Sequence, residues 1–137
     1  MKKSYFRKLL CTLLTLAMAL SITTSVFAAA SFEHQERLLH DGVKLRAEVS
    51  VVEYTKPVKR ITVECRLRCQ PTDTSGWVLQ ETWNFSETNS QTLYEVTYHV
   101  PTLKGRYQTE NIITVYYQDN TIETQLAYSN IVLNPPY

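Results

Sequence analysis

Ile61-Thr-Val-Glu-Cys-Arg-Leu-Arg-Cys69 is the most regular segment of this 137-residue sequence. Its apolar residues occupy every second position, and polar or charged residues occupy the positions between them. A period of two is typical of a β-strand that buries one face and leaves the other in water. The segment therefore predicts a half-buried strand.

Similar segments follow one another on both sides of this one, separated by turns rich in Pro, Gly, Asp, Asn and Ser. The predicted strands cover residues 43–51, 61–69, 77–85, 93–100, 111–117, 121–128 and 131–133. No segment between them predicts a helix long enough to connect parallel strands. About seven strands with regularly spaced turns predict an all-β fold, an antiparallel β-sandwich of the immunoglobulin-like kind.

The segment 77–85 is expected to place Trp77, Leu79, Trp83 and Phe85 on one face, with Glu81 as the exception. The segment 43–51 alternates regularly from Val43 onward. The segment 111–117 is apolar on both faces, which favours a central position in its sheet. A loop is expected before it, over residues 102–107.

Residues 31–40 allow two interpretations. Ser31, followed by Glu33, could cap a short helix. Asp41-Gly42 is instead a two-residue hairpin signal that leads directly into the predicted strand at 43–51. We favour an irregular or edge strand over the helix.

The first thirty residues predict a cleaved secretory signal peptide. Basic residues lie in the first eight positions, residues 9–22 are apolar apart from Thr and Ser, and Ala28, Ala29 and Ala30 offer cleavage sites. The fourteen residues of the apolar run are fewer than the about 20 that a membrane-spanning helix needs. The expected product is a secreted single domain of residues 31–137, with no stable membrane insertion after cleavage.

Removing residues 1–30 also changes the charge balance. The whole chain has 14 Lys and Arg against 13 Asp and Glu, a formal net charge of +1. Four of the basic residues and none of the acidic ones precede Ser31, which leaves 10 against 13 and a formal charge of −3. A mildly acidic domain without a basic cluster argues against nucleic acid as a partner.

Cys65 and Cys69 are the two cysteines that follow the predicted signal peptide. In a regular strand their Cα atoms would lie about 13 Å apart, because each residue adds about 3.3 Å. A disulfide needs a Cα separation of roughly 4.4–6.8 Å. We therefore expect two buried thiols. A bridge through a bulge or turn, an intermolecular pair and metal binding are the alternatives.

The order of landmarks resembles a known group of proteins. The strand that ends in the cysteines precedes Gly76-Trp-Val-Leu-Gln-Glu-Thr-Trp83, Gly105-Arg-Tyr107, Thr121-Ile-Glu-Thr124 and Tyr128-Ser-Asn130. This order is similar to that of small, largely uncharacterised secreted proteins of Gram-positive bacteria, which have a signal peptide and one β-sandwich domain. The resemblance covers most of residues 43–133 and implies no catalytic residues.

A looser resemblance connects the chain to immunoglobulin-like domains. It implies that Trp77 or Trp83 is the core tryptophan and that Tyr107 forms a tyrosine corner at the start of a late strand. Thr109 stands two residues after Tyr107, where antibody domains have a cysteine. The inter-sheet disulfide of antibody domains therefore cannot form.

Candidate residues for catalysis are few. His34, His40 and His99 are the only histidines, and His34 and His40 could gather around a metal with Glu36, although the spacing matches no known zinc site. No nucleophile elbow, Gly-rich phosphate loop or prominent carboxylate pair is present in the sequence. We therefore predict no catalytic residues, no cofactor-binding residues and no metal ligands. A metal-dependent hydrolase is the alternative.

Aromatic residues are the one sequence feature that suggests binding. The candidate binding surface consists of Trp77, Trp83, Tyr94, Tyr98, Tyr116, Tyr117 and Tyr128. Exposed aromatic rings can stack on sugars or anchor a protein partner, although Tyr and Trp are also favoured in strands for packing alone. The leading hypothesis is a secreted, non-enzymatic module that binds an extracellular protein or a surface glycan. A purely structural extracellular component is a further alternative.

Overall fold

The computed structural model describes residues 31–135, so the predicted signal peptide lies outside the described residues. The strands are β1 (Glu33–His40), β2 (Leu45–Val52), β3 (Val58–Pro71), β4 (Val78–Thr88), β5 (Thr92–His99), β6 (Gly105–Tyr117), β7 (Ile122–Tyr128) and β8 (Val132–Asn134). All strand pairs are antiparallel. Residues 31–135 contain no helix, and hence none that could cross a membrane.

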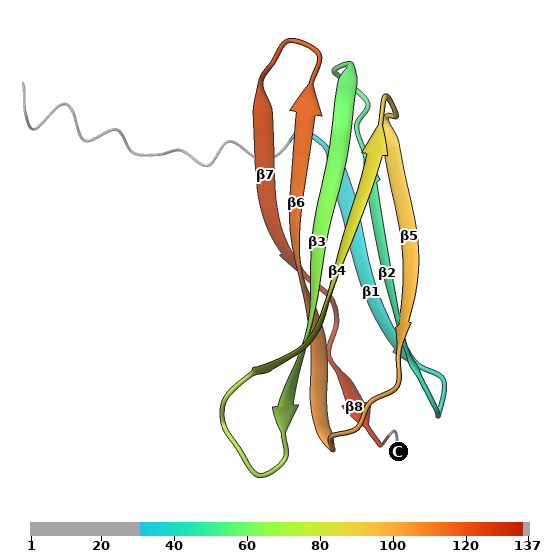
Figure 1. Ribbon diagram of the computed structural model, residues 1–137, viewed down its shortest axis with the longest axis vertical. Coiled ribbons are helices and arrows are strands. Elements are labelled where there is room, and N and C mark those ends of the chain that lie inside the picture. The colour runs from blue at the N-terminus through green and yellow to red at the C-terminus, as the bar shows by residue number, and fades with distance from the viewer. Residues whose placement is uncertain (1–30, 136–137) are drawn as a thin grey trace, which may run out of the picture.

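The strands form two sheets that pack against each other along the long axis of the molecule (Figure 1). The smaller sheet has the order β1-β2-β5, and the larger has the order β4-β3-β6-β7, with β8 paired to the lower part of β6. The prediction of an all-β fold with antiparallel, sandwich-like packing is confirmed. The fold has eight strands where about seven were predicted: the segment 131–133 corresponds to β8, and the additional strand is β1, in the segment 31–40 that allowed two interpretations.

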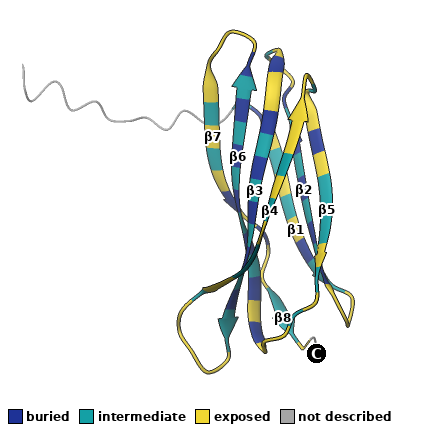
Figure 2. Ribbon diagram, in the orientation of Figure 1, coloured by how far each residue is buried: buried dark blue, intermediate teal, exposed yellow. Residues whose placement is uncertain are grey.

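β3 is the central element of the larger sheet, paired with β4 on one edge and β6 on the other. Ile61, Val63, Cys65, Leu67 and Cys69 are each at most 2% exposed, while the residues between them are half-buried. Figure 2 shows this alternation as dark blue bands along β3 and β6. The predicted strand is therefore confirmed, and its apolar face forms much of the core.

A bulge in β4 reverses the predicted orientation of part of that strand. Leu67 pairs with Glu81 but Arg68 pairs with Leu79, so Gln80 has no partner in β3. One extra residue moves every side chain before it to the opposite face. Leu79 is consequently 56% exposed, and its predicted place beside Trp83 is wrong.

Glu81 is the polar exception that the sequence had shown in this strand. It lies on the same face as Trp83 and Phe85, which pack against the core. Its Oε2 atom lies 2.6 Å from Nδ1 of His99 on β5, so this pair joins the edges of the two sheets. Glu81 therefore has a partner, His99, that it meets only because the two sheets pack together.

Residues 33–40 form an edge strand, as we favoured, and the helix alternative is wrong. The hairpin after it is longer than the Asp41-Gly42 signal predicted, because Oδ1 of Asp41 accepts hydrogen bonds from the amides of Val43 (2.9 Å) and Lys44 (2.7 Å). Val43 therefore belongs to the loop and is 67% exposed.

The strand predicted over 111–117 is central in its sheet, as expected, but it begins earlier. β6 starts at Gly105, so residues 105–107 belong to a strand and not to the predicted loop. The reason is pairing with two neighbours, since Gly105 lies opposite Pro71 of β3 and Asn134 of β8.

Both cysteines are free thiols in the core. Cys65 is 2% exposed and Cys69 is 0% exposed, and both point inward from one regular stretch of β3. Burial raises the pKa of the Cys65 thiol to about 12, so the reactive thiolate is scarce at neutral pH.

We therefore expect unfolded, unreduced protein starting at Ser31 to titrate two thiols per chain. The folded protein should react far more slowly at about pH 8, because both sulfurs are buried and protonated. A colorimetric thiol assay with and without denaturant measures both values. Finding no thiols in the unfolded chain would show that the cysteines are oxidised and would contradict the structure.

Candidate functional site

The structure distributes the seven predicted aromatic residues over three separate places. Trp83 and Tyr117 face the interior, where Tyr117 is only 1% exposed. Tyr94 (60% exposed) and Tyr98 (55% exposed) lie on the outer face of the smaller sheet. The other three are Trp77, Tyr116 and Tyr128. These three lie on the outer face of the larger sheet, so the seven do not form one surface.

Arg68 organises two of these three aromatic residues into a cluster. Its Cζ atom lies over the Trp77 ring at 5.5 Å and over the Tyr128 ring at 5.3 Å. Its Nη1 atom donates to Oε2 of Glu110 at 3.0 Å. We call Arg68, Trp77, Glu110 and Tyr128 the Arg68 cluster. Contacts of this kind restrain both aromatic rings and the guanidinium.

The Arg68 cluster continues into a charged row along β3. Nη1 of Arg66 lies 3.3 Å from Oε1 of Glu110, and Nε of Arg66 lies 2.6 Å from Oε1 of Glu64. These opposite charges compensate one another across β3 and β6. The outer face of the larger sheet therefore combines paired charges with aromatic rings held by Arg68.

A row of exposed side chains on the edge strand β7 includes Tyr128 of the Arg68 cluster and continues away from it. Ile122 is 59% exposed, Leu126 is 51% exposed and Tyr128 is 46% exposed, and all three point outward. Figure 2 shows exposed positions recurring along this strand. β7 is also the last strand in the order of its sheet. It thus combines an open backbone edge with an apolar row, the features that a protein partner can use for strand addition.

An open hollow of about 400 Å³ lies on the same outer face, over β3, β4 and β6. Its lining includes Thr62, Glu64, Asn84, Ile112 and Thr114. The lining is therefore rich in hydroxyl, amide and carboxylate groups, which can exchange hydrogen bonds with a polar ligand. The outer face of the larger sheet is therefore the candidate binding surface, because it carries the hollow, the Arg68 cluster and the edge strand β7.

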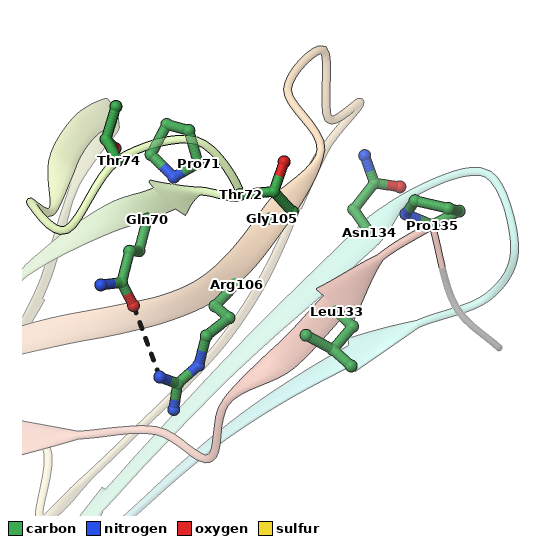
Figure 3. Close-up of a pocket in the computed structure, with 9 residues that line it drawn as sticks. All are labelled: Gln70, Pro71, Thr72, Thr74, Gly105, Arg106, Leu133, Asn134 and Pro135. Atoms are coloured by element: carbon green, nitrogen blue, oxygen red, sulfur yellow. Dashed lines mark hydrogen bonds between the residues drawn. The ribbon is translucent and has the colours of Figure 1, made fainter.

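A second cavity, of about 500 Å³, lies at the end of the sandwich between the turn after β3, the start of β6 and β8 (Figure 3). Nη1 of Arg106 donates to Oε1 of Gln70 at 3.4 Å, and Asn134 and Pro135 stand across the cavity from this pair. Arg106 is the one charged residue of its lining, which contains no histidine or carboxylate. The cavity can accept a small polar group but has no pair of residues for acid–base chemistry.

The three histidines have separate partners. Nδ1 of His34 lies 2.9 Å from Oε1 of Glu36, whereas Nε2 of His40 lies 2.9 Å from Oδ1 of Asn134. Burial raises the pKa of Glu36 above its ordinary value, and the contact with His34 opposes that rise. His40 therefore does not come together with His34 and Glu36, the residues considered with it as metal ligands. Within residues 31–135 no three His, Cys, Asp or Glu side chains are grouped so as to hold a metal ion.

Sequence reasoning missed the most strongly perturbed carboxylate, Glu53. It is 1% exposed, and its two oxygens accept hydrogen bonds from the amide and hydroxyl of Thr55 (2.6 and 2.7 Å) and from the hydroxyls of Tyr117 (2.7 Å) and Ser31 (2.9 Å). The alternation of β2 contained the signal. Counting by twos from Val49 and Val51 places Glu53 on the buried face.

No protein family and no curated protein matches the chain. Among solved structures it is similar to the crystal structure of the hypothetical protein PH1083 from Pyrococcus horikoshii OT3, with a TM-score of 0.42 and 13% identity over 74% of this chain and 91% of that chain. A similarity of that degree carries no argument about fold or function.

Proposed function

We propose that the chain is the precursor of a secreted, non-enzymatic module that binds an extracellular protein or a surface glycan. In this proposal the binding surface is the outer face of the larger sheet, not the full set of aromatic residues in the sequence. The observation that carries it is the Arg68 cluster, in which one guanidinium contacts Trp77, Tyr128 and Glu110 from neighbouring strands. Trp, Tyr and Arg are the residues most enriched among those that dominate binding energy.

A protein partner fits this surface better than a sugar. One guanidinium already lies over both the Trp77 and Tyr128 rings, so less of each ring remains free for a sugar to stack on. The apolar side chains of Ile122 and Leu126 beside an open strand edge suit the main-chain pairing and side-chain burial of a peptide. A surface glycan is the second ligand class of the proposal.

The immunoglobulin-like type of sandwich belongs to the same proposal. Two observations support it: the division of strands into β1-β2-β5 and β4-β3-β6-β7, and the Tyr107 side chain. The Tyr107 hydroxyl donates to the carbonyl of Leu103 at 3.0 Å, the backbone contact that defines a tyrosine corner. Trp83 contacts both parts of the core, although it lies on β4 and not on the central strand.

Secretion is the third component of the proposal, and the sequence of residues 1–30 supports it. A basic start, an apolar run and three alanines precede the first described residue, Ser31. The described fold begins where that pattern ends, since Phe32 is buried in the core at 4% exposure. The same features support membership in the group of secreted Gram-positive proteins that the sequence resembles.

We expect Trp77→Ala and Tyr128→Ala each to weaken partner binding at least tenfold, because each removes a ring that is held in place by Arg68. Tyr94→Ala removes an exposed aromatic ring from the outer face of the other sheet. It is the matched control and should bind like the wild type. The measurements are a glycan array and capture from the extracellular fraction of the source culture, followed by affinity determination with the isolated ligand.

Thermal unfolding of all three variants separates loss of binding from loss of folding. The surface assignment is wrong if a ligand is found and Tyr94→Ala abolishes its binding while Trp77→Ala and Tyr128→Ala do not. Failure of both ligand screens with folded wild-type protein would favour a purely structural role.

A further inference from the structure

Ser31, the first described residue, contacts two carboxylates, those of Glu53 and Glu123. We call Glu53, Lys56, Tyr117 and Glu123 the Ser31 site. Its backbone nitrogen donates to Oε2 of Glu123 at 3.0 Å. Its hydroxyl oxygen contacts Oε2 of Glu123 at 3.0 Å, Oε2 of Glu53 at 2.9 Å and the Tyr117 hydroxyl at 2.8 Å. Residues from β6, β7 and the segment after β2 thus converge on one residue at the beginning of the fold.

The Ser31 site has more negative than positive charges. Burial acts to raise the pKa of Glu53, but its hydrogen bonds outweigh burial and lower the pKa to about 2, so the group is ionised at neutral pH. The pKa of Glu123 is also lowered, because hydrogen bonds from Ser31 and Tyr117 outweigh the effect of burial. The positive charge of the Ser31 site comes from Lys56, whose Nζ atom lies 3.7 Å from Oε1 of Glu123. The Ser31 site therefore contains two negative charges, on Glu53 and Glu123, and one positive charge, on Lys56.

An independent feature of the sequence, a signal peptidase cleavage pattern, predicts that a second positive charge forms at Ser31. Ala28, Ala29 and Ala30 directly precede Ser31, so the Ala30–Ser31 bond has small residues at the first and third positions before it. That is the residue pattern of signal peptidase cleavage. Cleavage there would convert the neutral Ser31 amide, which already contacts Glu123, into an ammonium group.

We propose that a signal peptidase hydrolyses the Ala30–Ser31 bond and that the new α-ammonium group of Ser31 pairs with Glu123, which fixes the start of the mature fold. One water is consumed, Ala30 leaves as a carboxylate, and the freed Ser31 amine takes up a proton. Phe32 holds the group in position because its side chain is buried in the core at 4% exposure. The inference rests on the proposed secretion and adds the cleavage position and its structural role.

The geometry distinguishes this bond from the neighbouring ones. Each residue of extended chain adds up to about 3.5 Å, so cleavage after Ala28 would leave the ammonium roughly 7 Å of chain beyond Ser31. Only a neutral amide would then contact Glu123. Cleavage after Ala30 is the position that places the charge at the carboxylate.

The first test is the intact mass and N-terminal sequence of protein recovered from the culture medium of a Gram-positive host. We expect Ser31 as the first residue. A product that begins at Ala29 or Ala30 would overturn the cleavage position while leaving secretion intact. A chain that is neither exported nor shortened would overturn both.

The second test compares purified proteins that begin at Ser31 and at Ala29, released from a removable fusion partner. We expect the protein beginning at Ser31 to melt about 4 °C higher, the shift that a single favourable ion pair produces in a domain of this size. Glu123→Gln should abolish this difference, and Glu33→Gln, at an exposed glutamate of β1, should preserve it.

The pH dependence provides a further readout. An α-amino group ordinarily titrates near about 7.7–8.0, and pairing with Glu123 raises its folded pKa above the unfolded value. The advantage of the Ser31 protein should therefore be full below about pH 7 and lost as the pH rises to about 9.5. The charged and titratable groups facing the ammonium are Glu53, Lys56, Tyr117 and Glu123. Equal melting temperatures for the two proteins at neutral pH would overturn the proposed pairing.

Discussion

Gly105→Ala is expected to lower the free energy of unfolding by about 3 kcal/mol or more, the range of substitutions that force backbone rearrangement. An added Cβ would lie 2.2 Å from the Gln70 carbonyl oxygen and 2.9 Å from the Pro71 Cα atom. Both are backbone atoms of the neighbouring strand, so no side chain can rotate out of the way. The φ angle of +153° adds to the cost, since residues with a side chain rarely adopt it.

The measurement is the urea midpoint of the Gly105→Ala protein. Gly76→Ala is the matched control, because its added Cβ would meet no atom within 4 Å and should change the free energy of unfolding by less than about 0.5 kcal/mol. A stable Gly105→Ala protein would contradict the close approach of β3 and β6 at the end cavity.

Acidification is expected to remove about 3 kcal/mol of stability through Glu53 alone. Its pKa falls from an ordinary value of 4.5 to about 2 in the folded protein, because hydrogen bonds from Thr55, Tyr117 and Ser31 outweigh the effect of burial. A shift of this size corresponds to roughly 3 kcal/mol at about 1.4 kcal/mol per pH unit. Since the folded pKa is the lower one, the contribution is present above about pH 5 and is lost as the pH falls through about 2.

Glu53→Gln should reduce stability at pH 7 and flatten the dependence of stability on pH between about 5 and 2. Glu87→Gln, at an exposed glutamate of β4, should leave both unchanged within about 0.5 kcal/mol. Urea unfolding at several pH values measures both proteins. A wild type whose stability does not change between pH 5 and 2 would contradict the ionised, hydrogen-bonded state of Glu53. Glu123, whose pKa is also lowered, accounts for any dependence that remains in Glu53→Gln.

Much of the fold was predictable because strand alternation is a local property. Ile61 to Cys69 face the core and solvent in turn, as their period of two required. The same periodicity held for Leu45, Ala47, Val49 and Val51 of β2. The prediction failed where one residue interrupts the period, as Gln80 does in β4, because nothing in that segment marks the bulge.

The candidate site was less predictable because several elements assemble it. Sequence reasoning identified Trp77 and Tyr128 as binding candidates together with Trp83 and Tyr117, which are interior. The face that each occupies depends on pairing register, and register is set between strands. Arg68 was not singled out as a candidate, since its role comes from contacts with residues 9 and 60 positions away in the chain.

The amino-acid sequence alone was sufficient to predict the class of the fold and the approximate positions of most strands, and it favoured two unpaired, inward-facing thiols. These follow from the spacing of apolar residues, which burial against water imposes on each strand separately. The packing of the two sheets establishes which aromatic residues share a surface, which residue pairs with Glu81 and why Ser31 contacts two carboxylates. Such contacts join residues that are distant in the chain, and they arise only when two sheets pack in a particular register.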